Sequence, residues 1–302
     1  MINEIMCSQR GNMYLIEYAT IFVSKKTVVV KHSDKEKVEN IPIKNTVSIL
    51  LGAGTDITTM AKIELAKANV PIGCIGSTTG KFFGGVEIFF DNPSSIARTT
   101  KFSRSWIINT LNENKKVEMS QYFLLKRFEL AEKYWDTDLF YKLKTNKFSL
   151  YVDEFPFDKW KKGIYVHKTI PSLVDYEDGF MNNFYKVLGN IFNENDFDRE
   201  PLGQDKINVN ITLGNSIAYG LSNSVVWTLG IPLCFPIIHG NTNGGGLVYD
   251  IADLIKFSIV IPMAFAYSNV PTKVYTKELI DIILKNNILA DIFKIVEETA
   301  VL

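Results

Sequence analysis

The sequence has few cysteines and histidines, no excess of charge of either sign, and no long apolar run. Its three cysteines (Cys7, Cys74 and Cys234) are far apart and form no CxxC pair. Neither a disulfide framework nor a zinc cage is therefore predicted, and a reducing cytoplasmic location is expected. The most apolar run, Phe257 to Tyr267, is well short of the ~20 residues that a membrane-spanning helix needs. These absences indicate a soluble protein.

The first part of the chain, residues 1–92, is predicted to be a β-sandwich-like domain with one helix. Short runs rich in β-branched and aromatic residues alternate with polar turns, and the expected strands are Met13–Tyr18, Thr20–Val23, Thr27–Lys31, Thr46–Leu51, Pro71–Ile75 and Val86–Phe90. Thr55 and Asp56 are expected to cap the helix, whose apolar residues recur at helical spacing up to Ala68.

Beyond a turn-rich break at Asp91–Ser95, residues 93–302 are predicted to form an all-α domain, so the fold class is α+β. Helices are expected at Trp106–Asn112, Val117–Trp135, Leu173–Phe192 and Lys277–Thr299, the last one broken near Asn286-Asn287, with a mixed segment containing a loop at Phe148–Pro171.

The turn Gly52-Ala53-Gly54 is too incomplete to indicate a dinucleotide-binding site. The fingerprint needs another glycine at position 57, which is Ile57, and an acidic residue at the right distance is missing. A tight turn between a strand and a helix explains these glycines better.

The stretch from Leu213 to Phe265 combines two apolar segments with a polar loop. The second segment contains Asp250 and Asp253, which are three residues apart and so lie on one face of a helix. Its other positions are typical of a buried helix: Leu247, Val248, Ile251, Leu254, Ile255, Ile259 and Val260. Buried carboxylates need a partner, which can be a divalent cation or a basic side chain such as Lys256.

His239 lies in the loop before this helix, eleven residues ahead of Asp250. A lone histidine is more often structural than a ligand, but its place in a loop that leads straight to the Asp250 helix favours the ligand role. A neutral imidazole beside carboxylates can bind Mn²⁺ or Mg²⁺. The glycines Gly244, Gly245 and Gly246 would let the backbone approach a phosphate, or would simply make the loop flexible. We interpret the stretch as half of a metal-dependent phosphodiester site.

A third acid is expected from another helix. The segment Leu173–Phe192 contains Asp175, Glu177 and Asp178. The residue pattern alone does not choose among these three.

Two ordered blocks of sequence carry a resemblance to a known family. The first runs from Ile41-Pro42-Ile43 through LLGAGTDIT at Leu50–Thr58 to Val70-Pro71-Ile72-Gly73, and the second is IIHGNTNGGGLVYDIADLIK at Ile237–Lys256. The chain resembles the CRISPR-associated adaptation integrases and endonucleases ("Cas-one"), and within them the type I-F branch.

The resemblance implies an N-terminal β-sandwich, an α-helical catalytic domain and a homodimer. It also implies that His239 and Asp250 bind the metal and that Asp253 is the second acid of the same helix. The family's catalytic glutamate precedes a tyrosine by eight residues, and Glu177 precedes Tyr185 by eight, so Glu177 is the third expected metal ligand. The expected catalytic set is then Glu177, His239, Asp250 and Asp253.

The activity implied is insertion of new spacers into a CRISPR array by transesterification: a 3′-hydroxyl attacks a phosphodiester with the help of Mg²⁺ or Mn²⁺. Water in place of the hydroxyl would give nuclease activity. The expected partners are double-stranded spacer DNA, the CRISPR repeat and the small protein "Cas-two", which in the type I-F branch is fused to a helicase-nuclease.

The alternatives are a related transposon integrase, a branched-DNA repair nuclease, and a non-catalytic DNA-binding scaffold whose acids are paired with lysines. The thirty-three basic and thirty-three acidic residues cancel, so any DNA contact requires local patches. Candidate phosphate contacts, which are also typical of ordinary solvated surface, are Lys115 with Lys116, Lys142 with Lys144 and Lys147, and Lys159 with Lys161 and Lys162.

Overall fold

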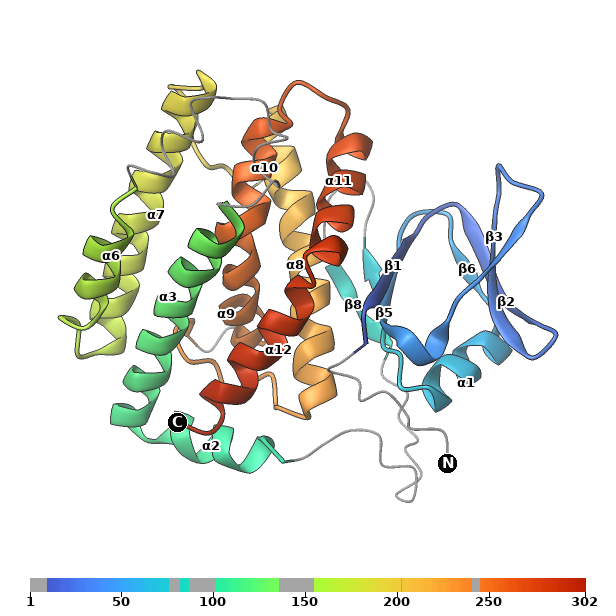
Figure 1. The fold of residues 1–302 in the computed structure, drawn as a ribbon, viewed down its shortest axis with the longest axis horizontal. Helices are drawn as coiled ribbons and strands as arrows, with labels where there is room; N and C mark the ends of the chain where they lie inside the picture. The colour runs from blue at the N-terminus through green and yellow to red at the C-terminus, as the bar shows by residue number, and fades with distance from the viewer. Residues whose placement is uncertain (1–9, 76–81, 87–100, 136–154, 202, 241–244) are drawn as a thin grey trace.

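A computed structural model describes residues 10–75, 82–86, 101–135, 155–201, 203–240 and 245–302 (Figure 1). A β domain is followed by a helical domain, as the sequence predicts. The predicted boundary after residue 92 lies outside the described residues.

The described part of the β domain forms two four-stranded sheets. One has the order β1-β5-β7-β8 (Asn12–Ile16, Thr46–Leu51, Ile72–Ile75, Phe82–Val86), and the other has the order β4-β3-β2-β6 (Val38–Asn40, Thr27–His32, Ala19–Ser24, Asp56–Ile57). In the first sheet β5 is parallel to β1 and β7, and β8 is antiparallel to β7. In the second, β3 is antiparallel to β2 and β4, and β6 is parallel to β2.

A shared apolar core joins the two sheets and confirms the β-sandwich prediction. Ile16, Ile49 and Ile72 of the first sheet form one buried cluster with Ile21 and Val30 of the second. All of β5 is buried, because Ile49 and Leu51 belong to this cluster whereas Val47 and Leu50 belong to the core of the helical domain. In β2 the exposed Thr20 separates the buried Ala19 and Ile21, as the two-residue period of a strand dictates.

The helix of the β domain, α1 (Thr59–Lys67), starts later than predicted. Its cap is Thr58, whose side chain accepts a hydrogen bond from the Ala61 amide. The expected cap at Thr55 and Asp56 is therefore wrong, because Asp56–Ile57 pairs with β2 as the short strand β6. The Gly52–Gly54 segment is a tight turn in which Ala53 O accepts a hydrogen bond from the Tyr18 amide.

The helical domain consists mainly of long helices. The elements within its described residues are α2 (Ser103–Leu111), α3 (Glu113–Trp135), α6 (Phe157–Ile164), α7 (Ile170–Phe192), α8 (Lys206–Leu229), α9 (Gly246–Ile255), a π-helical turn (Lys256–Val260), α10 (Ile261–Ala266), α11 (Thr272–Lys285) and α12 (Ile288–Thr299). The predicted break near residue 286 is confirmed, since Asn287 adopts a left-handed conformation between α11 and α12. The segment predicted as mixed contains a regular helix, α6.

Aromatic side chains fill the centre of the helical domain. Phe128 and Trp135 of α3 pack against Phe180 and Phe184 of α7 and against Phe257 of the π-helical turn. This cluster fixes α3 between α7 and the helix that carries Asp250 and Asp253, which places three elements distant in sequence around one point.

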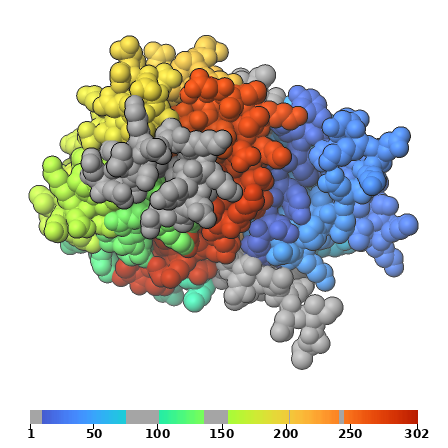
Figure 2. Space-filling model, turned by 45° about the horizontal axis from the view of Figure 1, so that its top comes forward, coloured from blue at the N-terminus to red at the C-terminus, as the bar shows by residue number. Residues whose placement is uncertain are grey.

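The two domains are in direct contact. Met13, Val47 and Leu50 of the first sheet belong to the core cluster of the helical domain, and α8 and α11 lie beside this sheet (Figure 1). In the space-filling view the orange atoms of the C-terminal third lie against the blue β domain (Figure 2). Within the described residues no helix is long and apolar enough to cross a membrane.

Candidate functional site

Asp250 and Asp253 lie on α9, at the centre of the helical domain. Both residues are buried, with 1% and 7% of their surface exposed, and the predicted apolar positions around them are buried as well. Because a charge in such a place must be neutralised or hydrogen-bonded, the partners of each carboxylate define what it does.

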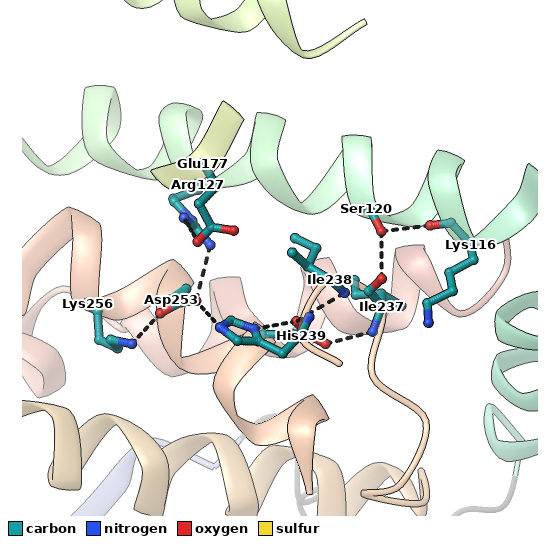
Figure 3. A network of polar contacts seen from close by, with 10 residues as sticks. Lys116, Ser120, Arg127, Glu177, Ile237, Ile238, His239, Asp253 and Lys256 are labelled. Carbon is teal, nitrogen blue, oxygen red and sulfur yellow. Dashed lines mark hydrogen bonds and ion pairs between the residues drawn. The ribbon is translucent and has the colours of Figure 1, made fainter. Parts of the chain in front are cut away.

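The Asp250 carboxylate binds the loop that leads to His239. Its Oδ2 accepts a hydrogen bond from the Ile237 amide (2.7 Å), and its Oδ1 accepts from the amides of Ile238 (3.2 Å) and His239 (2.9 Å). Oδ1 also lies 2.8 Å from Nδ1 of the His239 ring. Four nitrogen atoms of consecutive residues thus surround one buried carboxylate (Figure 3).

Helices α2 and α3 hold the same loop from its other side. Trp106 Nε1 donates to Phe235 O (2.9 Å), and the Ser120 hydroxyl lies between two acceptors, Ile237 O (3.0 Å) and Lys116 O (2.8 Å). The loop is therefore fixed through its carbonyls as well as its amides, which leaves the His239 ring little freedom.

The Asp253 carboxylate faces cations and the histidine ring. Lys256 Nζ lies 2.5 Å from its Oδ1, Arg127 Nη2 lies 3.3 Å from its Oδ2, and His239 Nε2 lies 3.6 Å from the same oxygen. Burial alone would raise the pKa of Asp253, but the charges of Lys256 and Arg127 outweigh burial and hold the pKa below its ordinary value. The pairing with Lys256 is the one that the sequence spacing allows.

Glu177 reaches the same place from α7. Its Oε1 lies 2.6 Å from Arg127 Nη1, and 12% of its side-chain surface is exposed. Asp175 and Asp178, the two other candidates on this helix, are exposed to solvent. Of the three candidate acids, Glu177 is the one that contacts Arg127, which also contacts Asp253 (Figure 3).

His239 is the most accessible member of the group, with 34% of its side chain exposed. Burial lowers the pKa of its imidazole, but the hydrogen bond to Asp250 and the charge of Asp253 outweigh this effect and raise the pKa above its ordinary value. Since an ionised carboxylate can only accept, Asp250 holds a proton on Nδ1. In the neutral ring, Nε2 then offers its lone pair toward Asp253.

Two of the three consecutive glycines have a steric role. Gly245 has a φ of +90°, and a Cβ on Gly246 would lie 2.9 Å from Gly240 O. A left-handed residue and a close backbone approach both require glycine, so these residues allow α9 to begin directly against the His239 loop. Gly244 lies outside the described residues.

The donors at this point suit a hard divalent cation. Two carboxylates and an imidazole nitrogen are ligands that Mg²⁺ and especially Mn²⁺ accept. Among the described residues no three acidic, histidine or cysteine side chains converge as a metal cage. Arg127 contacts Glu177 and Asp253, and Lys256 contacts Asp253. Asp250 is enclosed by its four nitrogen neighbours, so the accessible donors are Glu177, His239 Nε2 and Asp253.

The candidate phosphate contacts have mixed surroundings. Lys161 pairs with Glu132, and Lys115 pairs with Glu118 (2.9 Å). Lys159 and Lys162 are exposed and Lys116 is half-buried. Lys142, Lys144 and Lys147 lie outside the described residues.

Arg127 is the member of the site that sequence analysis missed. It is 3% exposed and contacts acids from both α7 and α9. The available signal was its position: Arg127 comes four residues after Phe123 and three after Leu124, on the apolar face of α3. A charged residue on such a face needs a buried partner.

The fold and the site define a two-domain α+β protein whose helical domain holds a buried acid and histidine centre at the junction of α3, α7 and α9. The family described as CRISPR associated protein Cas1 matches residues 13–298, and the chain belongs to this family. It is 30% identical over 272 residues to the CRISPR-associated endonuclease Cas1 of Pectobacterium atrosepticum (87% of this chain, 83% of the relative). It is 31% identical over 277 residues to that of Pseudomonas aeruginosa (87% and 84%).

Solved structures share the fold at low sequence identity. A TtCas1–DNA complex superimposes with a TM-score of 0.69 at 17% identity (95% of this chain, 91% of the other). A casposase bound to an integration product gives 0.70 at 12% identity (95% and 90%). A chain of a Cas6-RT-Cas1–Cas2 complex gives 0.69 at 14% identity (96% and 34%). These matches support the α+β fold over both domains.

Proposed function

We propose that the protein is a metal-dependent DNA endonuclease and integrase that inserts new spacers into a CRISPR array. Membership of the Cas1 family and similarity to two proteins named as Cas1 endonucleases support this proposal. The single observation that carries it is a linked arrangement of Glu177 on α7, Asp253 on α9 and His239 in the loop before α9. Arg127 contacts both acids, and His239 Nε2 lies 3.6 Å from Asp253 Oδ2.

In the proposed reaction, the 3′-hydroxyl of the incoming DNA attacks a phosphorus atom at the repeat boundary. A new P–O bond forms, the bond to the leaving 3′-oxygen breaks, and that oxygen leaves as a hydroxyl. Attack by water at the same place gives cleavage. No covalent enzyme intermediate is needed, so positioning and charge carry the rate.

Glu177, His239 and Asp253 would hold Mg²⁺ or Mn²⁺, which supplies polarisation of the phosphate and stabilisation of the leaving oxygen. Asp253 takes the ligand place that the sequence analysis gave to Asp250. Asp250 is a positioning residue in this proposal: it fixes the His239 loop and leaves Nε2 as the free ring nitrogen.

The proposed partners follow from the comparisons. Similar structures include a protein bound to DNA and one in a complex with Cas2, so we propose double-stranded DNA and Cas2 as partners. A homodimer, the type I-F branch with its Cas2 fused to a helicase-nuclease, and a cytoplasmic location are further parts of the proposal.

Two observations favour rival functions. The fold is shared with a casposase bound to an integration product, so a transposon-type integrase is the rival enzyme. The pairing of Asp253 with Arg127 and Lys256 is what a non-catalytic DNA-binding scaffold would show, because its acids need no metal.

The test is strand transfer with a branched DNA that mimics a half-integrated spacer, run in Mn²⁺, Mg²⁺ and EDTA. Wild type should rejoin or cut the DNA only with metal, and Asp253→Asn should do neither. Rejoining that survives EDTA would refute the metal-dependent reaction. DNA binding without any reaction, in the presence of purified Cas2, would favour the scaffold. A preference for transposon ends over CRISPR repeats would favour the transposon-type integrase.

A further inference from the structure

Arg127 occupies an unusual place for a cation. It lies in the middle of α3, and its neighbours along the buried face, Phe123, Leu124 and Phe128, are all apolar. The described residues give its Nε no hydrogen-bond partner. The guanidinium is held instead through Nη1 by Glu177 and through Nη2 by Asp253.

A purely structural role explains this arrangement poorly. A buried ion pair generally contributes little more to stability than apolar side chains of similar size would. The aromatic cluster of Phe128, Phe180 and Phe257 beside Arg127 shows that this part of the core packs well with apolar groups. The role of Arg127 is therefore to be sought in its contacts with Glu177 and Asp253 rather than in the stability of the core.

We infer that Arg127 is a positioning residue of the proposed metal centre: it joins Glu177 and Asp253 before metal binds, and its charge sets how tightly the centre holds a divalent cation. This inference rests on the proposed function, because the cation in question is the one that Glu177, His239 and Asp253 would bind.

The charges around the centre determine whether loss of Arg127 raises or lowers the affinity for metal. Glu177, Asp250 and Asp253 contribute three negative charges, and Arg127 and Lys256 contribute two positive ones. Arg127 contacts two of the carboxylates that the metal would use, so it repels the metal at short range while keeping those carboxylates together. Loss of its charge should make the folded protein less stable without metal and more avid for metal.

The test compares wild type with Arg127→Gln, which removes the charge, and Arg127→Lys, which keeps the charge but cannot bridge both acids. Mn²⁺ affinity is measured by calorimetry, and Tm is measured in EDTA and in Mn²⁺. Arg127→Gln should bind Mn²⁺ roughly tenfold more tightly or better, with a lower Tm in EDTA and a larger rise on adding Mn²⁺. Arg127→Lys should keep the wild-type affinity and show a lower Tm in EDTA.

The outcomes distinguish a role of Arg127 in metal binding from a purely structural role. A folded Arg127→Gln with wild-type or weaker Mn²⁺ affinity would overturn the inference, because a merely structural residue would give that result. If Arg127→Gln does not fold in EDTA, its behaviour in Mn²⁺ decides: recovery of the folded state on adding Mn²⁺ supports the inference, and failure to fold with Mn²⁺ overturns it. An altered Mn²⁺ affinity in Arg127→Lys also overturns it. If wild type binds no Mn²⁺ at all, the proposed function is what fails.

Discussion

Replacing Asp250 by asparagine tests whether this residue positions the His239 loop. The two side chains have the same shape, but an amide has one acceptor oxygen and an NH₂ group. If the amide oxygen takes the place of Oδ1, the NH₂ group faces the Ile237 amide, and if it takes the place of Oδ2, the NH₂ group faces the other three nitrogens. At least one buried donor is left without an acceptor either way.

The size of the effect follows from the buried network. A hydrogen bond to a charged group contributes about 1.5–3 kcal/mol, and breaking a buried charged network by removing one partner costs about 3–5 kcal/mol. For Asp250→Asn we expect a loss in this second range, which corresponds to a fall in Tm of about 6–20 °C. Because loss of a group that orients a metal-binding histidine typically costs 10–100-fold, Mn²⁺ affinity should drop by roughly that factor.

Hydrogen exchange measures the cause directly. In wild type the amides of Ile237, Ile238 and His239 should be protected, and in Asp250→Asn these three should lose protection before the rest of the helical domain. Asp178→Asn, an exposed change on α7, serves as the control and should match wild type. Mn²⁺ binding abolished while these amides stay protected would refute the positioning role and assign Asp250 as a ligand.

Four further predictions concern the same site and its substrate. Glu177→Gln should reduce cleavage at least 100-fold, whereas Asp178→Asn, one residue away but exposed, should leave it unchanged in the same assay. In the proposed metal centre, protons would compete with Mn²⁺ for His239 Nε2. Because the pKa of His239 is raised above 6.5, Mn²⁺ affinity should decline as the pH is lowered from 8.5, with a midpoint above pH 6.5; constant affinity down to pH 5 would contradict this. The lowered pKa of Asp253 adds stability that is present above the unfolded-state pKa near 3.8 and is lost as pH falls through the folded-state pKa, so acid unfolding should be less steep in Asp253→Asn. DNA binding should weaken linearly in log K against log salt, and a flat response would exclude phosphate contacts.

Local patterns made the elements of the helical domain predictable. The apolar periodicity of α3, α7 and α9 and the turn signal at Asn286-Asn287 depend on neighbouring residues, so they can be read without the fold. The start of α1 was mispredicted because Asp56 and Ile57 pair with β2, and pairing with a distant strand leaves no local signal.

Helical spacing on α7 could also have selected Glu177 over Asp175 and Asp178. Glu177 comes four residues after Leu173 and three before Phe180, both buried, so the three share a helix face. Asp175 and Asp178 fall on the opposite side. The contact with Arg127 was not predictable, because it joins residues fifty positions apart and depends on how α3 packs against α7.

Asp250 and Asp253 differ in role although they share a helix, a residue type and a face. Asp250 faces the amides of a loop that ends eleven residues before it, and those donors enclose its oxygens. Asp253, one turn further along, faces two cations and Nε2 of His239. Side-chain cations can withdraw or share a carboxylate when a metal arrives, whereas backbone amides of a fixed loop cannot. A metal can therefore replace the partners of Asp253 more easily than those of Asp250, and for this reason we assign the proposed ligand role to Asp253.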